Sequence, residues 1–386
     1  MSREYRLQLI EQIETARGSK VVVYVTGDRQ PWQLFGSRIA EDAVRPLYKH
    51  LSRLPQQLKR IDFFLYSRGG DVSVPWRIVS AIREFCEEFS VLIPYKAYSA
   101  ATMICLGADQ IVMGKKAELG PIDPTLTRAI AGSPEGTAPP PEISVEDVSS
   151  YVSFMRDRAR ITDQAALATV ISQLAAQLTP LTLGAVNRQH SHIRLVARKL
   201  LTSRSEKMKE TRINRVVEAL TEKTYFHGHA IGRGEAEELG LPVVRPDDAL
   251  EEKIWALYED YESLLNLNEP LDLEETLIAQ NSEETTVPGL LLAIIESAAM
   301  VDGFAATAVF RRKRQIPPNP QINVNLNLNV PGVPVQNLPP PVQQLLQQLL
   351  AQVLPQIPPI IAQEIARQSP TVGFEGRLYG GKWKPM

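Results

Sequence analysis

The chain has 386 residues, enough for one large domain or two domains of ordinary size. Hydrophobic residues make up 44% and charged residues 22%, so most of the chain can bury a core. The 42 basic and 44 acidic residues give a formal net charge of −2, which argues against binding nucleic acid over a broad surface. The two cysteines, Cys86 and Cys105, exclude a disulfide framework and a four-cysteine zinc site. They fit a reducing compartment, and we expect a cytoplasmic protein.

The N-terminal residues are polar and carry no pattern of a signal peptide. The most apolar stretch, residues 289–310, is interrupted by Glu296 and Asp302. We therefore expect no membrane span.

The first part of the chain alternates between two kinds of hydrophobic pattern. Residues 21–26 (VVVYVT) and 61–66 (IDFFLY) are runs typical of strands buried on both faces of a sheet. Strands that alternate with helices indicate parallel βαβ units with right-handed crossovers, and hence an α/β fold. Further strands are predicted at 90–97 and 111–113, and helices at 41–53, 75–89 and 100–108.

After a surface loop at residues 132–142, which is rich in Pro and Gly, the chain is predicted to become largely helical. A last helix and strand close the domain. The helices are predicted at 145–160, 163–177, 184–201, 206–222, 234–239 and 247–265, and the strand at 241–244.

The prolines mark a change of character, because 13 of the 29 lie in the last 72 residues. We expect a domain at 1–265, a connecting segment at 266–316 that ends in a solvated basic turn, and a Pro-rich extension at 317–386. In that extension, strict alternation at 322–330 predicts a half-buried strand, and residues 342–354 predict an amphipathic helix. We expect this extension to self-associate or to recruit a target.

Two places in the α/β part can carry chemistry. Gly69 and Gly70 follow a predicted strand, and adjacent glycines let backbone N–H groups approach a ligand closely, although a plain turn has the same composition. Ser99 lies between a predicted strand and a predicted helix, at the carboxyl edge of the sheet where ligands bind. The helix N-terminus would stabilise an oxyanion there, although Ser99 also fits an ordinary N-cap.

Longer stretches around these residues resemble a known family. They are LYSRGGDVSVPWRIVSAIREF, VLIPYKAYSAATMICLGADQIVMGKKAELGPIDP, LTPLTLGAVNRQHSHIRLVARKLL and HGHAIGRGEAEELGLPV. The sequence is similar to the serine dehydrogenase proteinase (SDH) family, one of the Clp-protease/crotonase-fold serine peptidases related to signal peptide peptidase A. The resemblance covers residues 10–260. It implies a Clp/crotonase-like fold, with repeated ββα units around a parallel sheet and added helices.

The resemblance also assigns roles. Ser99 occupies the nucleophile position, and the N–H of Ala100 with that of Gly69 or Gly70 would form the oxyanion hole. The implied activity is hydrolysis of peptide bonds in a protein or peptide substrate, by a homo-oligomer without a cofactor.

The sequence departs from the family pattern at three positions. Arg68 stands where the family tends to have proline, Ala101 where it tends to have glycine, and Thr125 where glutamine is usual. None of these changes removes the nucleophile, but Arg68 adds a cation beside the oxyanion loop.

The general base is not fixed by the sequence. A serine hydroxyl needs a base within hydrogen-bond reach, and no histidine lies between residues 51 and 189. Because side chains alternate between the two faces of a strand, Lys96 is expected to point to the face opposite Ala97 and is not a favoured base. The candidates are His190, with His192 on another face of the same helix, and His227 as an alternative, with His229 close to it.

Two other functions remain open. Acyl-CoA chemistry at the same oxyanion hole would need carboxylates near the glycines, and Asp71 is the one candidate. A catalytically weak or inactive oligomeric scaffold is the other alternative, because no base is evident. A metal site at His227 and His229 is not expected, since Glu235 and Glu237 are predicted on the exposed face of a helix.

Overall fold

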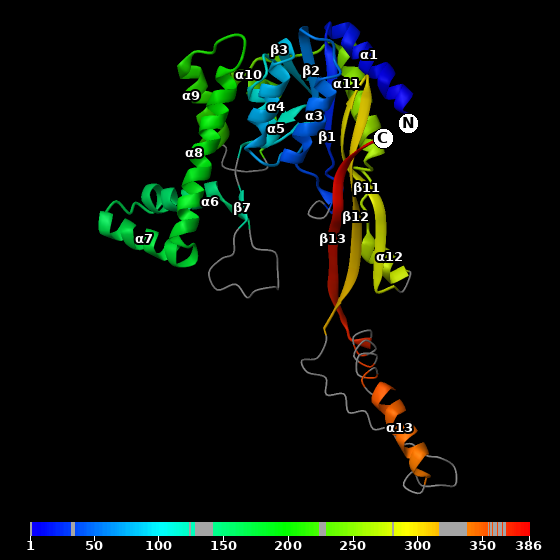
Figure 1. Ribbon diagram of the computed structural model, residues 1–386. Helices are drawn as coiled ribbons and strands as arrows, with labels where there is room; N and C mark the ends of the chain where they lie inside the picture. The colour runs from blue at the N-terminus through cyan, green and yellow to red at the C-terminus, as the bar shows by residue number, and fades with distance from the viewer. Residues whose placement is uncertain are drawn as a thin grey trace. The chain divides into compact units, whose positions relative to one another are not determined.

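A computed structural model describes most of the chain (Figure 1). It covers residues 2–31, 35–122, 125–127, 142–223, 229–279, 282–315, 338–353, 355, 357, 361, 365 and 368–386. The chain forms two compact units. Unit 1 contains Met1–Leu271, Leu291–Ala306 and Gly381–Met386, and unit 2 contains Asp272–Leu290 and Thr307–Gly380.

Unit 1 is built on a large central sheet in which strands alternate with helices. The strand order is β10-β5-β3-β2-β1-β11-β12-β13. The predicted α/β class is therefore confirmed. The strands are β1 (Lys20–Thr26), β2 (Leu58–Tyr66), β3 (Cys86–Ile93), β5 (Gln110–Met113), β10 (Val243–Val244), β11 (Glu284–Ser297), β12 (Met300–Arg314) and β13 (Thr371–Pro385).

The expected parallel sheet makes up only part of this order. Strands β10, β5, β3, β2 and β1 pair in parallel, whereas β11 pairs antiparallel with β1, Val22 opposite Ser297. The parts of β11, β12 and β13 in unit 1 thus extend the sheet with segments from outside residues 1–265. These strands lie in residues 266–316, which were predicted as a connecting segment, and in the C-terminal extension. In the structure Glu296 is fully buried and accepts hydrogen bonds from Arg6 (2.7 Å) and Tyr261 (2.8 Å), which compensate its charge.

One helix prediction is wrong at its end. Helix α4 (Val74–Arg83) stops six residues before the predicted end at residue 89, and β3 begins at Cys86. Apolar residues at 85, 86 and 89 fit a helical period. The segment nevertheless forms a strand, because its backbone pairs with β2, where Leu58 lies opposite Cys86. The predicted strand at 90–97 is accordingly divided into β3 and the short β4 (Lys96–Ala97).

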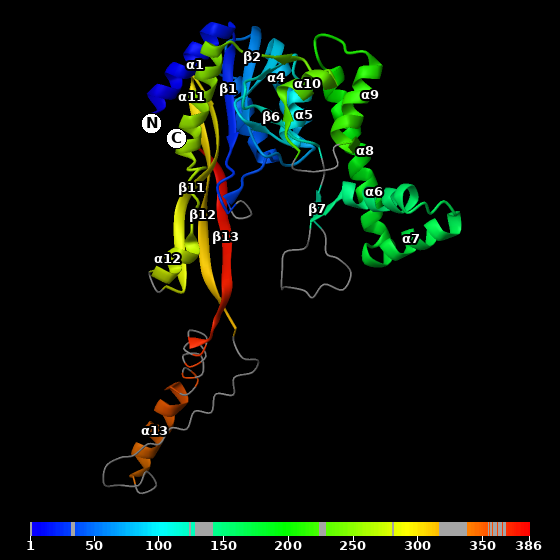
Figure 2. The ribbon, with the colours of Figure 1, turned by 180° about the vertical axis from the view of Figure 1, so that it is seen from behind.

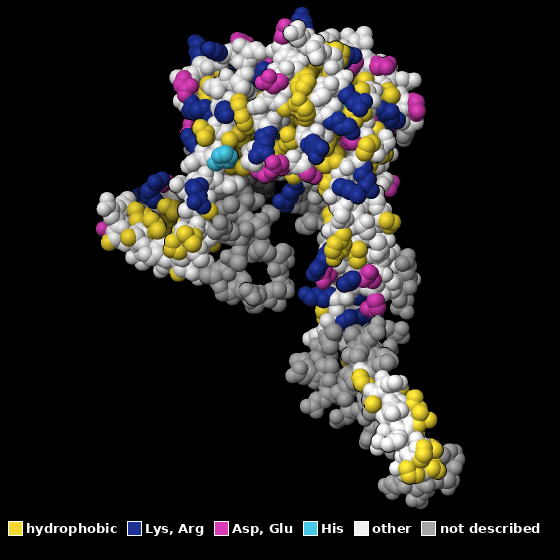
Figure 3. All heavy atoms as spheres, viewed as in Figure 1, with side chains coloured by type: hydrophobic (Ala, Val, Ile, Leu, Met, Phe, Trp, Pro, Cys, Tyr) yellow, Lys and Arg dark blue, Asp and Glu magenta, His cyan; other side chains and the backbone are white. Residues whose placement is uncertain are grey.

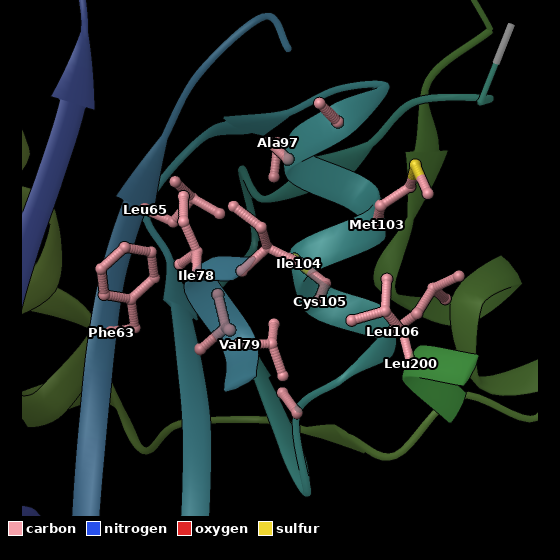
Figure 4. Close-up of a cluster of buried hydrophobic side chains, with 14 of the residues drawn as sticks. Phe63, Leu65, Ile78, Val79, Ala97, Met103, Ile104, Cys105, Leu106 and Leu200 are labelled. Atoms are coloured by element: carbon pink, nitrogen blue, oxygen red, sulfur yellow. The ribbon is translucent and has the colours of Figure 1, made fainter. Parts of the chain in front are cut away.

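Both faces of the sheet are covered, as its continuous hydrophobic strands require. Alternate residues of β1 face opposite sides: Val22 and Tyr24 pack with the core under α3 (Val44–Leu51), α4, α5 (Ala100–Leu106) and α8 (Pro180–Thr202). Val21 and Val23 pack with the core under α1 (Arg3–Arg17) and α11 (Asp248–Leu264). Figures 1 and 2 show the two helical layers from opposite sides. Figure 4 shows the tight packing of α4 and α5 against β2, with Leu200 of α8 beside Leu106.

The remaining predicted helices of unit 1 are confirmed with small shifts of their ends. Two small sheets accompany them, one of order β4-β6-β9 and one of β7 and β8. The elements are η1 (Glu41–Ala43), α6 (Val145–Ser153), a π-helical turn η2 (Phe154–Arg158), α7 (Gln164–Gln177), α9 (Glu210–Glu218), η3 (Ala219–Lys223), α10 (Arg233–Leu239), β6 (Glu118–Leu119), β7 (Thr125–Thr127), β8 (Glu142–Ser144) and β9 (Ile231–Gly232).

Within the described ranges no single helix is long and apolar enough to cross a bilayer. Helices α7 and α8, which meet at a bend of 100°, have the length and composition of a broken span when taken together.

Unit 2 contains α12 (Leu273–Ala279), α13 (Pro340–Val353) and parts of β11, β12 and β13. The predicted amphipathic helix is confirmed in α13, whereas the strand predicted at 322–330 lies outside the described residues. The basic cluster at 311–314 is not a turn but the end of β12, where Arg311 pairs with Glu284 and Arg314 with Glu283.

Candidate functional site

Ser99 stands at the N-terminus of α5 in a strained backbone conformation. Its φ of 51° and ψ of −113° lie in a region that costs a non-glycine residue about 1–3 kcal/mol. It holds the predicted N-cap position, but its hydroxyl makes no capping hydrogen bond. The reading of Ser99 as an ordinary cap is therefore wrong, and the half-buried hydroxyl is left available at the carboxyl edge of the sheet.

The strain at Ser99 is held by the residues around it. The buried Thr102 hydroxyl lies 2.7 Å from both the Ala97 and the Gly120 carbonyl oxygens, so it joins the first turn of α5 to β4 and to the loop after β6. Gly120 leaves room for the neighbouring Tyr98, since a Cβ at residue 120 would lie 2.7 Å from its ring. These contacts fix the direction in which Ser99 leaves β4.

The two glycines after β2 lie directly against this serine. A Cβ added to Gly69, whose φ is 106°, would be 2.8 Å from the Cβ of Ser99 and 2.7 Å from the Tyr98 carbonyl oxygen. A Cβ added to Gly70 would be 2.2 Å from the Ile39 carbonyl oxygen. Glycine is thus required at both positions for steric reasons. The structure brings together the glycines and Ser99, which the sequence places 29 residues apart.

The backbone N–H groups of this loop are not equivalent. Gly69 N–H donates to the Ser67 hydroxyl (3.0 Å), which also accepts a hydrogen bond from the Thr26 hydroxyl (2.7 Å). Among the residues that the structure describes, the N–H groups of Gly70 and Ala100 have no hydrogen-bond acceptor. The N–H of Ala100 is free because the first turn of a helix lacks internal acceptors. Of the two glycines, Gly70 therefore keeps its donor for a ligand.

The histidines predicted as bases are found in different environments. His190 lies on α8 three residues before the buried Ile193, and burial, with a smaller contribution from Arg194, lowers the pKa of its imidazole. His192 on the same helix is exposed. His227 lies outside the described residues.

His229 lies near the end of the small sheet that carries Ser99. In this sheet β6 separates β4 from β9, with Ala97 opposite Leu119 and Leu119 opposite Ile231. Because β9 runs antiparallel, the residues that precede Ile231 are at the same end as Ser99. The Nε2 atom of His229 lies 3.0 and 3.1 Å from the two carboxylate oxygens of Glu235, and both side chains are exposed.

Two cations near the loop of Gly69 and Gly70 are bound to one carboxylate. Arg68 Nε donates to Asp28 (2.9 Å), and Lys96 Nζ lies 3.9 Å from the same carboxylate group. Lys96 also lies over the ring of Tyr95, 4.4 Å from its centroid. This placement agrees with the expectation that Lys96 points away from the face of Ala97. The Asp28 carboxylate compensates part of the charge that Arg68 adds.

Other parts of the site give less support to the alternatives. The Asp71 carboxylate, considered for acyl-CoA chemistry, accepts the N–H of Ser73 (2.8 Å) in the turn before α4. In the described part of the chain no three His, Cys, Asp or Glu side chains are close enough together to hold a metal ion.

Ile39, Thr26 and the role of Ser67 were not predicted from the sequence. For Ser67, its position two residues before the first glycine is only a weak sequence signal of that role. No sequence signal points to Ile39.

Comparison with known proteins relates this site to a family. Residues 2–136 match the family of ClpP-like SDH-type serine proteinases, which confirms the predicted resemblance over the segment that holds Gly69, Gly70 and Ser99. Two uncharacterised proteins of Methanocaldococcus jannaschii are 26% and 23% identical over 267 residues. The alignments cover 66% of this chain and 78% and 76% of the relatives.

Solved structures with similarity to the chain include two proteases. A mutant of the membrane-bound stomatin-specific protease 1510-N is 15% identical, with a TM-score of 0.34 over 56% of this chain and 79% of the other. ClpP1 from Listeria monocytogenes is 13% identical, with a TM-score of 0.32 over 62% of this chain and 97% of the other.

Proposed function

We propose that the chain is a serine peptidase in which Ser99 attacks the carbonyl carbon of a peptide bond. The observation that carries this proposal is the contact between the strained Ser99 and the loop of Gly69 and Gly70, within the part of the chain that matches the family of serine proteinases. The hydroxyl loses its proton to a general base as the acyl-enzyme forms, and the leaving amine takes up a proton. Water then hydrolyses the ester.

The oxyanion hole of this proposal uses the N–H groups of Gly70 and Ala100. Both are free of other acceptors in the described residues, whereas the N–H of Gly69 is bound to Ser67. Two preorganised donors of this kind stabilise the charge that develops on the carbonyl oxygen. Gly69 then contributes through the space it leaves beside Ser99.

For the general base we propose His190, with His227 as the alternative. Because its pKa is lowered, the imidazole of His190 stays neutral down to a lower pH than that of a free histidine. The neutral imidazole can accept a proton. We also propose a homo-oligomer in the cytoplasm that acts on protein or peptide substrates without a cofactor.

A second candidate is a catalytically weak or inactive oligomeric scaffold. One observation favours it: the Ser99 hydroxyl has no hydrogen-bond partner among the described side chains. A hydroxyl without a base is a poor nucleophile.

Labelling with a fluorophosphonate probe tests the two candidates. We expect wild type to be labelled, Ser99→Ala to be unlabelled, and the matched control Ser172→Ala, which changes an exposed serine of α7, to be labelled like wild type. Labelling that persists in Ser99→Ala would remove Ser99 from the mechanism. Unlabelled wild type that forms a stable oligomer in mass photometry would favour the scaffold.

A further inference from the structure

A hollow on the surface of unit 1 lies beside α3. It has a volume of about 670 Å³, and we call it the α3 pocket. None of its lining residues belongs to the loops around Ser99. Those used below are Arg45, Tyr48, Lys49, Arg53, Asp302 and Trp383.

A row of cations follows one side of the α3 pocket. Arg45 and Lys49 are one helical turn apart on α3, and Arg53 follows after four more residues. Arg45 and Arg53 are exposed and form no ion pair with any residue in the described ranges. Like charges at this spacing repel, so the row costs stability without a partner. Figure 3 shows lysine and arginine side chains on the face of unit 1 where α3 lies.

Two aromatic side chains, Tyr48 and Trp383, also line the α3 pocket. The indole N–H of Trp383 donates to the Asp42 carboxylate (3.1 Å), and its ring centroid lies 6.3 Å from Tyr24 and 5.5 Å from Phe304. The indole is therefore held in place before any ligand binds. Tyr48, on α3, adds a second ring to the lining.

The charge of Asp302 in this pocket is already compensated. Its carboxylate oxygen Oδ2 lies 3.5 Å from Lys49 Nζ and 3.2 Å from His50 Nε2. Of the cationic row, Arg45 and Arg53 thus remain for an external anion.

The α3 pocket is connected to the proposed oxyanion loop through a short piece of chain. Ile39 N–H donates to the Gly69 carbonyl (2.8 Å), and the Ile39 carbonyl accepts from Asp71 N–H (2.8 Å). Arg45 follows Ile39 after only six residues. A peptide that leaves the pocket along this segment would be led toward the loop that contacts Ser99.

We propose that the α3 pocket is a docking site for an extended acidic peptide segment of the substrate. Arg45 and Arg53 are eight residues apart, which corresponds to about 12 Å at the rise of a helix. Side chains four residues apart on one face of an extended strand are about 13 Å apart, so two carboxylates of such a segment can meet the two arginines. An aromatic residue of the peptide packs against Trp383. This inference names the substrate class of the proposed peptidase and rests on that function.

A peptide suits the α3 pocket better than a nucleic acid. The carboxylates of Asp42 and Asp302 in the lining interrupt the positive charge of the pocket. The continuous phosphate backbone of a nucleic acid would be repelled where it passes these carboxylates. The net charge of −2 also provides no long-range attraction for a polyanion.

Fluorescence anisotropy on the full-length Ser99→Ala protein tests the docking site without turnover. The probe is a labelled nine-residue peptide with glutamate at alternate positions and one phenylalanine, and the control peptide has glutamine instead of glutamate. We expect Arg45→Glu with Arg53→Glu to weaken binding at least tenfold, and Arg45→Lys with Arg53→Lys to weaken it less than threefold. The matched control, Lys207→Glu with Lys209→Glu, makes the same change of net charge at exposed residues outside the pocket and should change binding less than twofold.

Three results would overturn the docking site: equal binding of the glutamine peptide, an equal loss in the Lys207/Lys209 control, or equally effective competition by a single-stranded oligonucleotide of the same charge. The two proposals can fail separately. Lost fluorophosphonate labelling with intact peptide binding rejects the peptidase alone, and intact labelling without peptide binding rejects the docking site alone.

Discussion

Two regions of unit 1 hold a serine of interest, and they differ in every property that catalysis needs. Ser297 lies 2.9 Å from His50 Nδ1, and His50 Nε2 lies 3.2 Å from Asp302, so a serine, a histidine and an aspartate form a chain. Ser297 and His50 are completely buried and Asp302 is 3% exposed. Ser99 has no such chain around it in the described residues, yet it is half-buried and strained, and it lies beside free N–H donors.

This contrast shows that residue types in hydrogen-bond contact do not by themselves make an active site. The buried chain joins α3 to the hairpin of β11 and β12, and a substrate cannot reach it. The hydrogen bond between His50 Nδ1 and the Ser297 hydroxyl satisfies these two buried groups, whereas His50 Nε2 and Asp302 Oδ2 lie 3.2 Å apart without forming a hydrogen bond. At Ser99 the fold instead maintains backbone strain and leaves donors unsatisfied, which costs stability and is typical of functional sites.

The largest expected effect separates the two serines. Ser99→Ala should lower peptide hydrolysis at least about 10³-fold, because it removes the nucleophile and leaves only the oxyanion hole and binding. Ser297→Ala should leave hydrolysis within about twofold but lower the free energy of unfolding by about 1–3 kcal/mol, since His50 loses its partner. Hydrolysis of a fluorogenic peptide library and urea unfolding measure both. Loss of activity in a folded Ser297→Ala protein would reverse the assignment.

A smaller effect is expected from the space beside Ser99. Gly69→Ala places a Cβ 2.8 Å from the Cβ of Ser99, so the loop of Gly69 and Gly70, the proposed oxyanion hole, must move, and we expect kcat to fall about 10²-fold. Gly184→Ala is the matched control, because a Cβ there has no atom within 4 Å. Steady-state kinetics and the rate of fluorophosphonate labelling report the change. Unchanged kcat in Gly69→Ala would mean that the loop does not contact the reacting group.

The sequence predicts the Ser99 region better than the region around Ser297. Both glycines and Ser99 follow strands of a parallel set, and the carboxyl ends of parallel strands meet at one edge, so their convergence can be inferred from short segments. The backbone strain at Ser99 cannot be inferred, because it depends on contacts such as that of Thr102 with Gly120.

The strands β11 and β12 were missed for a different reason. Glu296 and Asp302 make their segment look like a connecting region, and their partners Arg6 and His50 lie more than 240 residues away. A compensated buried charge cannot be distinguished from an exposed one without those partners. His50 also precedes Ser99 in the chain, whereas the histidines predicted as bases follow it.

The smallest expected effect concerns the pH dependence of stability at the buried chain. Burial lowers the pKa of His50 to about 4, and Lys49 and Arg53 act in the same direction while Asp302 opposes them. Between pH 6.5 and 4 the unfolded chain therefore binds a proton that the folded chain does not, and stability should fall by about 1–3 kcal/mol as the pH drops through this range. His50→Gln can keep a hydrogen bond to Ser297 but does not titrate, so its free energy of unfolding should change less over the same range. Urea unfolding at pH 7, 5.5 and 4.5 measures the difference. Equal pH dependence in both proteins would show that His50 has the same pKa in the folded and the unfolded chain, so that burial does not keep its imidazole neutral.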